Sequence, residues 1–229
     1  MEPPPRLYLW FFLILLLALA ADFGGLLAAL FLGMAFIPAL LYMNWFRNLE
    51  KHDPEPWGAL YQAFFWGAIT GIIAAGIISS IFVVFVALAA GVIVAQIVGA
   101  IIIAPFVEEF LKPLGIIRGG VRKEVDEVED GLIYGAACGL GFAATENLIY
   151  GWSVIGEGVA VTAAVIVMRT FSSTLVHASA TALTGHGLSQ HFVHGASWRV
   201  VAKYYLAAVG LHAFWNGMMT LGSYDFLPG

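Results

Sequence analysis

The 229-residue chain contains a single cysteine, and only 11% of its residues are charged, against roughly 25% in a soluble domain. The lone Cys138 excludes an intrachain disulfide and a cysteine-based metal cluster. The scarcity of charge, together with a hydrophobic content of 61%, excludes a water-soluble globular domain and a disordered chain. A formal net charge of −5 gives no sign of nucleic-acid binding. The composition therefore predicts an integral membrane protein whose first partner is the lipid bilayer.

Long apolar runs separated by polar or glycine-rich stretches predict an all-α protein, a polytopic bundle of about seven transmembrane helices in one membrane domain over residues 1–229. The expected spans are residues 7–21, 26–46, 58–88, 91–117, 130–151, 159–187 and 199–221. The third and fourth spans are separated at Ala89-Ala90-Gly91, because an uninterrupted helix of about 45 residues would be twice as long as the bilayer is thick. Arg6 before the first run and small residues after it also fit a signal peptide, but we expect this segment to be retained as a helix.

Lysine and arginine follow a pattern that predicts the orientation of the chain. Eight of the ten basic residues fall in alternate connections between the expected spans: Arg6, Arg47, Lys51, Arg118, Arg122, Lys123, Arg199 and Lys203. Because basic residues concentrate in cytoplasmic loops, we expect the N-terminus in the cytoplasm and the C-terminus outside. The loops are short, so any chemistry has to lie within the helix bundle or at its rim.

Ionisable residues within the spans are the candidates for function, because each costs about 2.5–3.5 kcal/mol to insert. They are Glu108, Glu109 and Lys112 in the fourth expected span, Glu146 in the fifth, Arg169 and His177 in the sixth, and His212 with the polar Asn216 in the seventh. Glu108 and Lys112 are four residues apart and share a helix face, as do His212 and Asn216. The catalytic part of the chain is therefore expected within residues 91–221.

Carboxylates and imidazoles that meet inside a bundle have a chemical use as zinc ligands. A catalytic zinc keeps three protein ligands and a water, whose pKa the metal lowers. We expect Glu146, His177 and His212 to bind Zn²⁺, and Glu108 to take the proton of the water as general base. Asn216 is expected to donate a hydrogen bond to the oxyanion.

Three further residues are expected to support this site: Lys112, Asn147 and Arg169. Glu109 is counted with Glu108 among the catalytic carboxylates and is expected to pair with Lys112 or Arg169. Asn147 follows Glu146 directly in the chain. Such partners orient metal ligands.

Several segments, in this order along the chain, resemble the PrsW-type membrane proteases. The motifs are KHDPEPW (51–57), EEFLK (108–112), GFAATENLIY (141–150), the Arg169 and His177 pair, and HAFWN (212–216). The resemblance implies an intramembrane metalloprotease, related to the CAAX prenyl endopeptidases, in a prokaryotic cell membrane. It also implies a membrane-anchored protein substrate such as an anti-sigma factor.

Other interpretations remain open at this stage. Two carboxylates without a metal can activate water if one is protonated and the other ionised. Intramembrane carboxylates and histidines also form the ion path of a proton- or cation-coupled transporter, although the sequence has no inverted repeat of the kind many transporters show. A non-catalytic scaffold or receptor is the third possibility.

Overall fold

The computed structural model describes residues 13–14, 17–18, 24–51 and 53–223. Every regular element in these residues is a helix, which confirms the all-α class. Five helical segments of the described chain are long and apolar enough to cross a membrane, against the seven expected: Gly25–Arg47, Trp57–Ala90, Val92–Gly115, Asp130–Ser153 and Val159–His194. The expected span 7–21 lies almost entirely outside the described residues. The C-terminal helix, near the expected span 199–221, is long but is not among the five.

The helical segments divide into shorter elements. They are α2 (Gly25–Arg47), α3 (Trp57–Phe65), the π-helical turn η1 (Trp66–Gly71), α4 (Ile72–Ala90), α5 (Val92–Val98), the π-helical turn η2 (Gly99–Ile103), α6 (Ala104–Leu111), the 3₁₀ turns η3 (Lys112–Gly115) and η4 (Val121–Lys123), α7 (Asp130–Ser153), the 3₁₀ turn η5 (Ile155–Glu157), α8 (Val159–Phe171), α9 (Ser173–His194) and α10 (Trp198–Ser223).

Two chain breaks decide how these helices are arranged. Gly91 separates α4 from α5 with a φ of +88°, a conformation that glycine adopts without strain, at the break expected from the sequence. The expected sixth span is not one straight helix: Ser172, with φ −122° and ψ −81°, separates α8 from α9. In addition, α9 continues to His194, seven residues beyond the expected end of this span.

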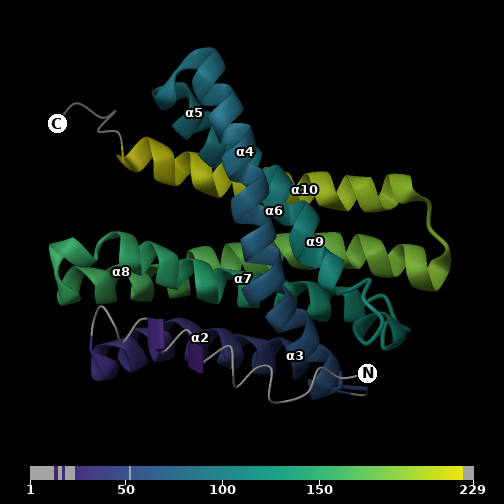
Figure 1. The fold of residues 1–229 in the computed structure, drawn as a ribbon. Coiled ribbons are helices and arrows are strands. Elements are labelled where there is room, and N and C mark those ends of the chain that lie inside the picture. Colours follow the sequence, from purple (N-terminus) through teal and green to yellow (C-terminus); the bar gives the residue numbers. More distant parts are fainter. Residues whose placement is uncertain (1–12, 15–16, 19–23, 52, 224–229) are drawn as a thin grey trace.

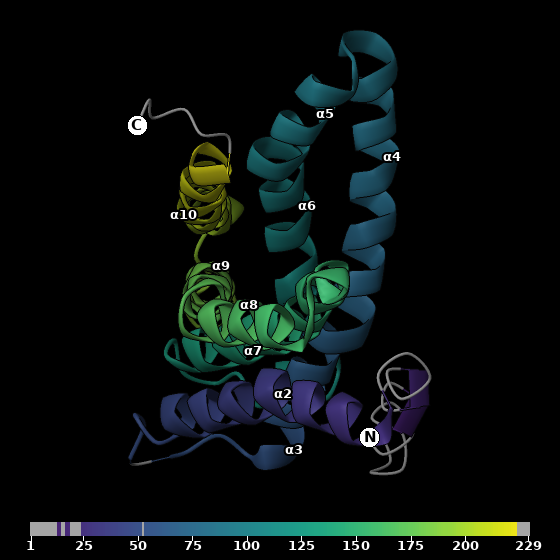
Figure 2. The same cartoon turned by 90° about the vertical axis from the view of Figure 1, so that its left-hand side faces the viewer.

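Helix α7 lies at the centre of the molecule and packs against α2, α3, α8 and α9 (Figure 1). Helix α10 lies beside α9, and α4 and α6 run side by side and cross α7, α9 and α10 at a steep angle (Figure 2). Most residues of α7 are buried on all sides, whereas α4 buries only Ala75. The core of the molecule is therefore built around α7, and the polar residues on its neighbours face inward.

Glycines spaced four residues apart allow α7 to approach α9 closely. A β-carbon at Gly135 would lie 2.5 Å from the carbonyl oxygen of Thr181, and one at Gly139 would lie 2.7 Å from the carbonyl carbon of His177. On α9, a β-carbon at Gly185 would collide with the backbone of Gly131. Small residues at this spacing are the usual means of close helix packing in membranes, where no hydrophobic effect drives the helices together. The backbone around His177 is thereby fixed against α7.

The segment before α3 is held to the N-terminal part of α7 through Glu55. The Tyr134 hydroxyl donates to the Glu55 carboxyl, and Arg47 Nε donates to the Glu55 carbonyl oxygen at 2.6 Å. Glu55 is 4% exposed, and burial, together with a hydrogen bond from Glu55 to Asp130, raises the pKa of this carboxyl from 4.5 to about 9. Glu55 is therefore protonated in the folded chain at neutral pH.

Candidate functional site

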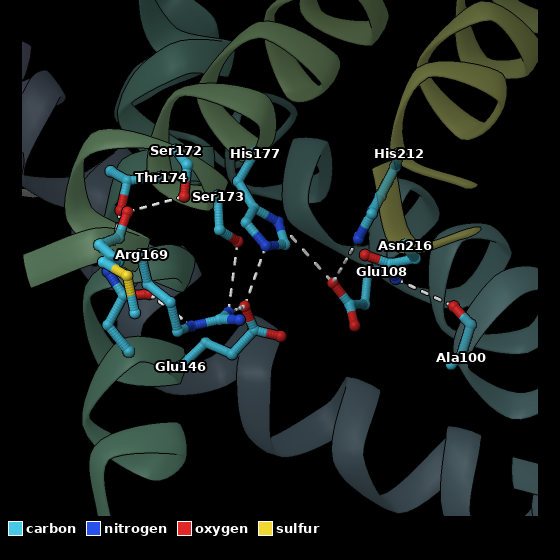
Figure 3. Close-up of polar contacts among 12 residues, drawn as sticks. Ala100, Glu108, Glu146, Arg169, Ser172, Ser173, Thr174, His177, His212 and Asn216 are labelled. Atoms are coloured by element: carbon cyan, nitrogen blue, oxygen red, sulfur yellow. Dashed lines mark hydrogen bonds and ion pairs between the residues drawn. The ribbon is translucent and has the colours of Figure 1, made fainter. Parts of the chain in front are cut away.

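Three side chains from three helices meet in the interior of the bundle. Glu108 of α6, His177 of α9 and His212 of α10 are 8%, 2% and 2% exposed. Glu108 Oε2 lies 3.9 Å from His177 Nδ1 and 3.9 Å from His212 Nε2. Both imidazoles point toward the Glu108 carboxylate (Figure 3). We call these three residues the Glu-His-His cluster.

The Glu-His-His cluster has the donor atoms of a metal site. One potential ligand atom from each residue lies within 4.8 Å of the others. Two imidazole nitrogens and one carboxylate oxygen form a ligand set that catalytic zinc sites use, with one position left for water. Moreover, Glu108 Oε2 is fully buried and makes no well-oriented hydrogen bond among the described residues, and its charged partner is Lys112 Nζ at 3.1 Å. Burying a carboxylate is costly unless a cation lies beside it, and an ammonium group or a metal ion can supply that charge at this oxygen. The residues therefore fit a metal.

Glu109 connects the cluster to a second layer of polar contacts. It is completely buried and accepts hydrogen bonds from Lys112 Nζ at 2.8 Å and Thr181 Oγ1 at 3.0 Å. His212 Nδ1 lies 2.8 Å from Glu109 Oε1. A carboxylate accepts only, so His212 carries its proton on Nδ1 and turns the lone pair of Nε2 toward Glu108. Carboxylate–histidine pairs of this kind fix metal-ligating imidazoles.

Lys112 lies inside the same group, where the helix tightens from α6 into η3. Its side chain runs back along α6, so that Nζ lies 3.1 Å from Glu108 Oε2 and 2.8 Å from Glu109 Oε1. The same atom lies 2.6 Å from His177 Nδ1 and 4.3 Å from the centre of the Phe142 ring. Lys112 is 0% exposed, so all of its contacts are made within the protein.

The expected ligand Glu146 lies outside the Glu-His-His cluster. Its carboxylate is held by Arg169 Nη2 at 2.6 Å and by His177 Nε2 at 2.9 Å, on the side of His177 away from Glu108 (Figure 3). The physical reason is the position of α8 beside α7, which brings the Arg169 guanidinium to Glu146. The structure thus places Glu108, rather than Glu146, next to both imidazoles. Of the two partners expected for Glu109, the structure pairs it with Lys112, and it pairs Arg169 with Glu146 instead.

Asn147 and its neighbours hold Arg169 in place. Asn147 is completely buried; its Oδ1 accepts from Arg169 Nε at 3.0 Å, and its Nδ2 donates to Thr174 Oγ1 at 2.8 Å. Arg169 Nη2 also donates to Ser173 Oγ at 3.2 Å, just after the break between α8 and α9. Asn147 therefore supports Arg169 directly and the cluster indirectly.

Asn216 sits beside Glu108 but makes a contact that the sequence did not predict. Its Nδ2 donates to the Ala100 carbonyl oxygen at 2.9 Å, within the π-helical turn η2 (Figure 3). A wide π turn exposes carbonyl groups that an α-helix would bond internally, and such turns are frequent at functional sites. An amide nitrogen carries two hydrogens, so one N–H of Asn216 remains for another acceptor.

Sequence reasoning did not predict the contacts of two side chains that shape this site, Thr181 and Phe142, although Phe142 lies in the 141–150 motif. Thr181 follows His177 by four residues on the same face of α9, and this spacing was the available signal for its bond to Glu109. Phe142 of α7 covers both Lys112 and His177, with its ring centre 5.6 Å from that of the imidazole. An apolar residue gives no sequence signal of such a role.

Comparison with known proteins identifies a family that this chain matches. Residues 55–227 match the model of the PrsW family of intramembrane metalloproteases. The chain is 30% identical over 118 residues to protease PrsW of Clostridioides difficile, covering 51% of this chain and 48% of the relative. It is 28% identical over 123 residues to protease PrsW of Bacillus subtilis, covering 53% and 52%. The chain thus matches about half the length of these curated relatives. No solved structure gives a significant match.

Proposed function

The chain belongs to the PrsW family of intramembrane metalloproteases, and from this membership and the geometry of the site we propose that it is a membrane-embedded endopeptidase. Its reaction is the hydrolysis of a peptide bond in a membrane-anchored protein. The observation that carries the proposal is the Glu-His-His cluster: a metal-binding set of side chains, buried among apolar helices and supported by its own carboxylate, lysine and threonine.

The proposed roles follow from which atoms face the centre of the Glu-His-His cluster. His177 and His212 hold the metal with one ring nitrogen each, and Glu108 adds the carboxylate oxygen that faces them. When bound, Zn²⁺ supplies a water of lowered pKa and polarises the carbonyl group of the substrate. The second oxygen of Glu108 accepts the proton of the attacking water. The remaining N–H of Asn216 donates to the developing oxyanion.

The supporting residues keep these groups in position. Glu109 holds the His212 imidazole with its Nε2 toward the centre, and Thr181 and Lys112 hold Glu109. Glu146, fixed by Arg169, accepts the Nε2 proton of His177. A neutral imidazole donates with one nitrogen only, so this contact leaves Nδ1 for a ligand on the Glu108 side.

The substrate and the orientation extend the proposal. We propose an N-terminus in the cytoplasm of a bacterial cell and a C-terminus outside, which the pattern of basic loops supports. The resemblance to the PrsW-type proteases makes a membrane-anchored anti-sigma factor the first substrate to test.

The test is cleavage of a membrane-anchored reporter protein by the purified chain in lipid vesicles. Wild-type protein should cleave the reporter, and Glu108→Gln should not, although both insert and fold alike. The matched control is Glu157→Gln, which removes the same charge from an exposed turn and should leave cleavage unchanged. Equal cleavage by Glu108→Gln would exclude the proposed base. Ion uptake into the vesicles without any cleaved product would contradict the protease.

A further inference from the structure

The lone pair of His177 Nδ1 is already in use. Lys112 Nζ lies 2.6 Å from this nitrogen, and an ammonium group has three donors and no acceptor. The Nδ1 atom must therefore accept, while Nε2 faces the Glu146 carboxylate at 2.9 Å and donates to it. A metal needs the same lone pair that Lys112 binds. The two cations cannot share it.

Lys112 also occupies the Glu108 side of the cluster. Its Nζ lies 3.1 Å from Glu108 Oε2, the oxygen that faces both imidazoles. The ammonium group thus contacts two of the three atoms that would bind the metal, and Phe142 covers it with its ring at 4.3 Å. Of the three ligand atoms, His212 Nε2 is the one with no hydrogen bond or ion pair to Lys112 among the described residues.

Lys112 has a second partner, Glu109, outside the three candidate metal ligands. The Lys112 Nζ atom also donates a hydrogen bond to Glu109 Oε1 at 2.8 Å. Glu109 is completely buried and bears a full charge that two neutral donors, Thr181 and His212, do not neutralise. Because Glu109 stays as its partner, Lys112 can leave His177 and Glu108 without becoming a buried unpaired charge.

We propose that Lys112 is an internal cation that takes the place of the metal between Glu108 and His177 when the site is empty of metal, and withdraws onto Glu109 when a metal binds. This proposal rests on the metal site of the proposed function and adds that Lys112 competes with the metal for that site. Lys112 prevents repulsion between the two buried glutamates before loading and lowers the affinity for the metal.

Metal affinity tests this directly. Purified full-length protein, freed of metal by a chelator, is titrated with Zn²⁺ against a chromophoric chelator of known affinity. Lys112→Met, which keeps the length and removes the ammonium group, should bind one Zn²⁺ per chain at least about tenfold more tightly than wild type, since a positive charge leaves the binding position. The matched control is Lys203→Met, which makes the same replacement at an exposed lysine of α10 outside the cluster. It should change the affinity less than about threefold, because its charge lies outside the cluster.

Equal affinity of wild type and Lys112→Met would overturn the proposal, as would the same gain in Lys203→Met or no metal binding in any of the three proteins. A second measurement uses wild-type protein and so does not depend on whether the Lys112→Met variant folds. In wild-type protein with ¹⁵Nζ-labelled lysine, saturation with Zn²⁺ should shift the resonance of Lys112 and leave those of the other three lysines in place. An unshifted Lys112 resonance at one bound metal per chain would refute the withdrawal. Cleavage of the reporter by wild-type protein but not by Glu108→Gln tests the protease separately.

Discussion

Replacing Gly139 by alanine tests whether the close approach of α7 and α9 positions His177. The added β-carbon would lie 2.7 Å from the His177 carbonyl carbon and 2.9 Å from Ala178 Cα, whereas 3.4 Å begins ordinary contact. The His177 carbonyl oxygen would lie closer still, so the two helices have to separate by at least about 0.7 Å at this point. Overpacking of this kind costs about 1–3 kcal/mol. A misplacement approaching 1 Å in a reactive group costs on the order of 10²-fold in rate.

The assay compares thermal unfolding in detergent and reporter cleavage in vesicles. For a chain of this size, 1–3 kcal/mol corresponds to a midpoint lowered by roughly 2–12 °C. Cleavage by Gly139→Ala should fall by about 10–100-fold. The control is Gly76→Ala in α4, where a β-carbon meets nothing within 4 Å, so that neither quantity should fall. A Gly139→Ala protein with wild-type stability and wild-type cleavage would refute the positioning of His177 by this contact.

Three further predictions concern buried polar groups. Glu109→Gln weakens the acceptor that orients His212 and should lower Zn²⁺ affinity, measured by chelator competition, by about 10–100-fold; an unchanged affinity would contradict this role. Thr181→Val removes a buried hydrogen bond to Glu109 and should lower the free energy of unfolding by about 1.5–3 kcal/mol, whereas wild-type stability would mean that the bond contributes nothing. Between pH 6 and pH 9 the thermal midpoint of the wild type should fall, and that of Glu55→Gln should fall less. Only the wild type has a carboxyl at this position, with a pKa of about 9 in the folded chain, and it loses the stability due to the bound proton as the pH rises.

The sign of this last effect follows from proton binding. The unfolded chain releases the Glu55 proton near the ordinary pKa of 4.5, and the folded chain keeps it up to about 9. The stability due to this proton is thus complete below pH 4.5 and is lost as the pH rises toward 9. A fall of equal size in Glu55→Gln would assign the pH dependence to another carboxyl such as Glu50, whose pKa is also raised by burial.

The sequence predicted the helices well because apolar runs and their interruptions are local properties. The break at Gly91 was expected from helix length, and α7 (Asp130–Ser153) begins at the expected residue. The break at Ser172 was not predicted, because one serine in an otherwise helical run does not reveal a backbone kink. The π-helical turn η2 was not predicted either, because its residues, Gly99–Ile103, are apolar and continue the helical run.

For the site, helical spacing predicted which residues share a face but not which faces meet. Glu108, His177 and His212 were expected near one another, and the structure brings them together. The pairing of Arg169 with Glu146 depends on α8 lying beside α7, which is a property of the tertiary fold. The ligand roles of these residues, and that of Zn²⁺, stay predictions.

The central claim is that Glu108 and His212 act together in one reactive centre, and a double-variant comparison of cleavage tests it most directly. Glu108→Gln and His212→Ala should each lower reporter cleavage by about 10³-fold or more, because each removes a group that the reaction needs. Residues that act as a unit are not additive, so the double variant should be no slower than the slower single variant. Either folded single variant retaining more than about a tenth of wild-type cleavage, or losses that multiply in the double variant, would contradict the claim.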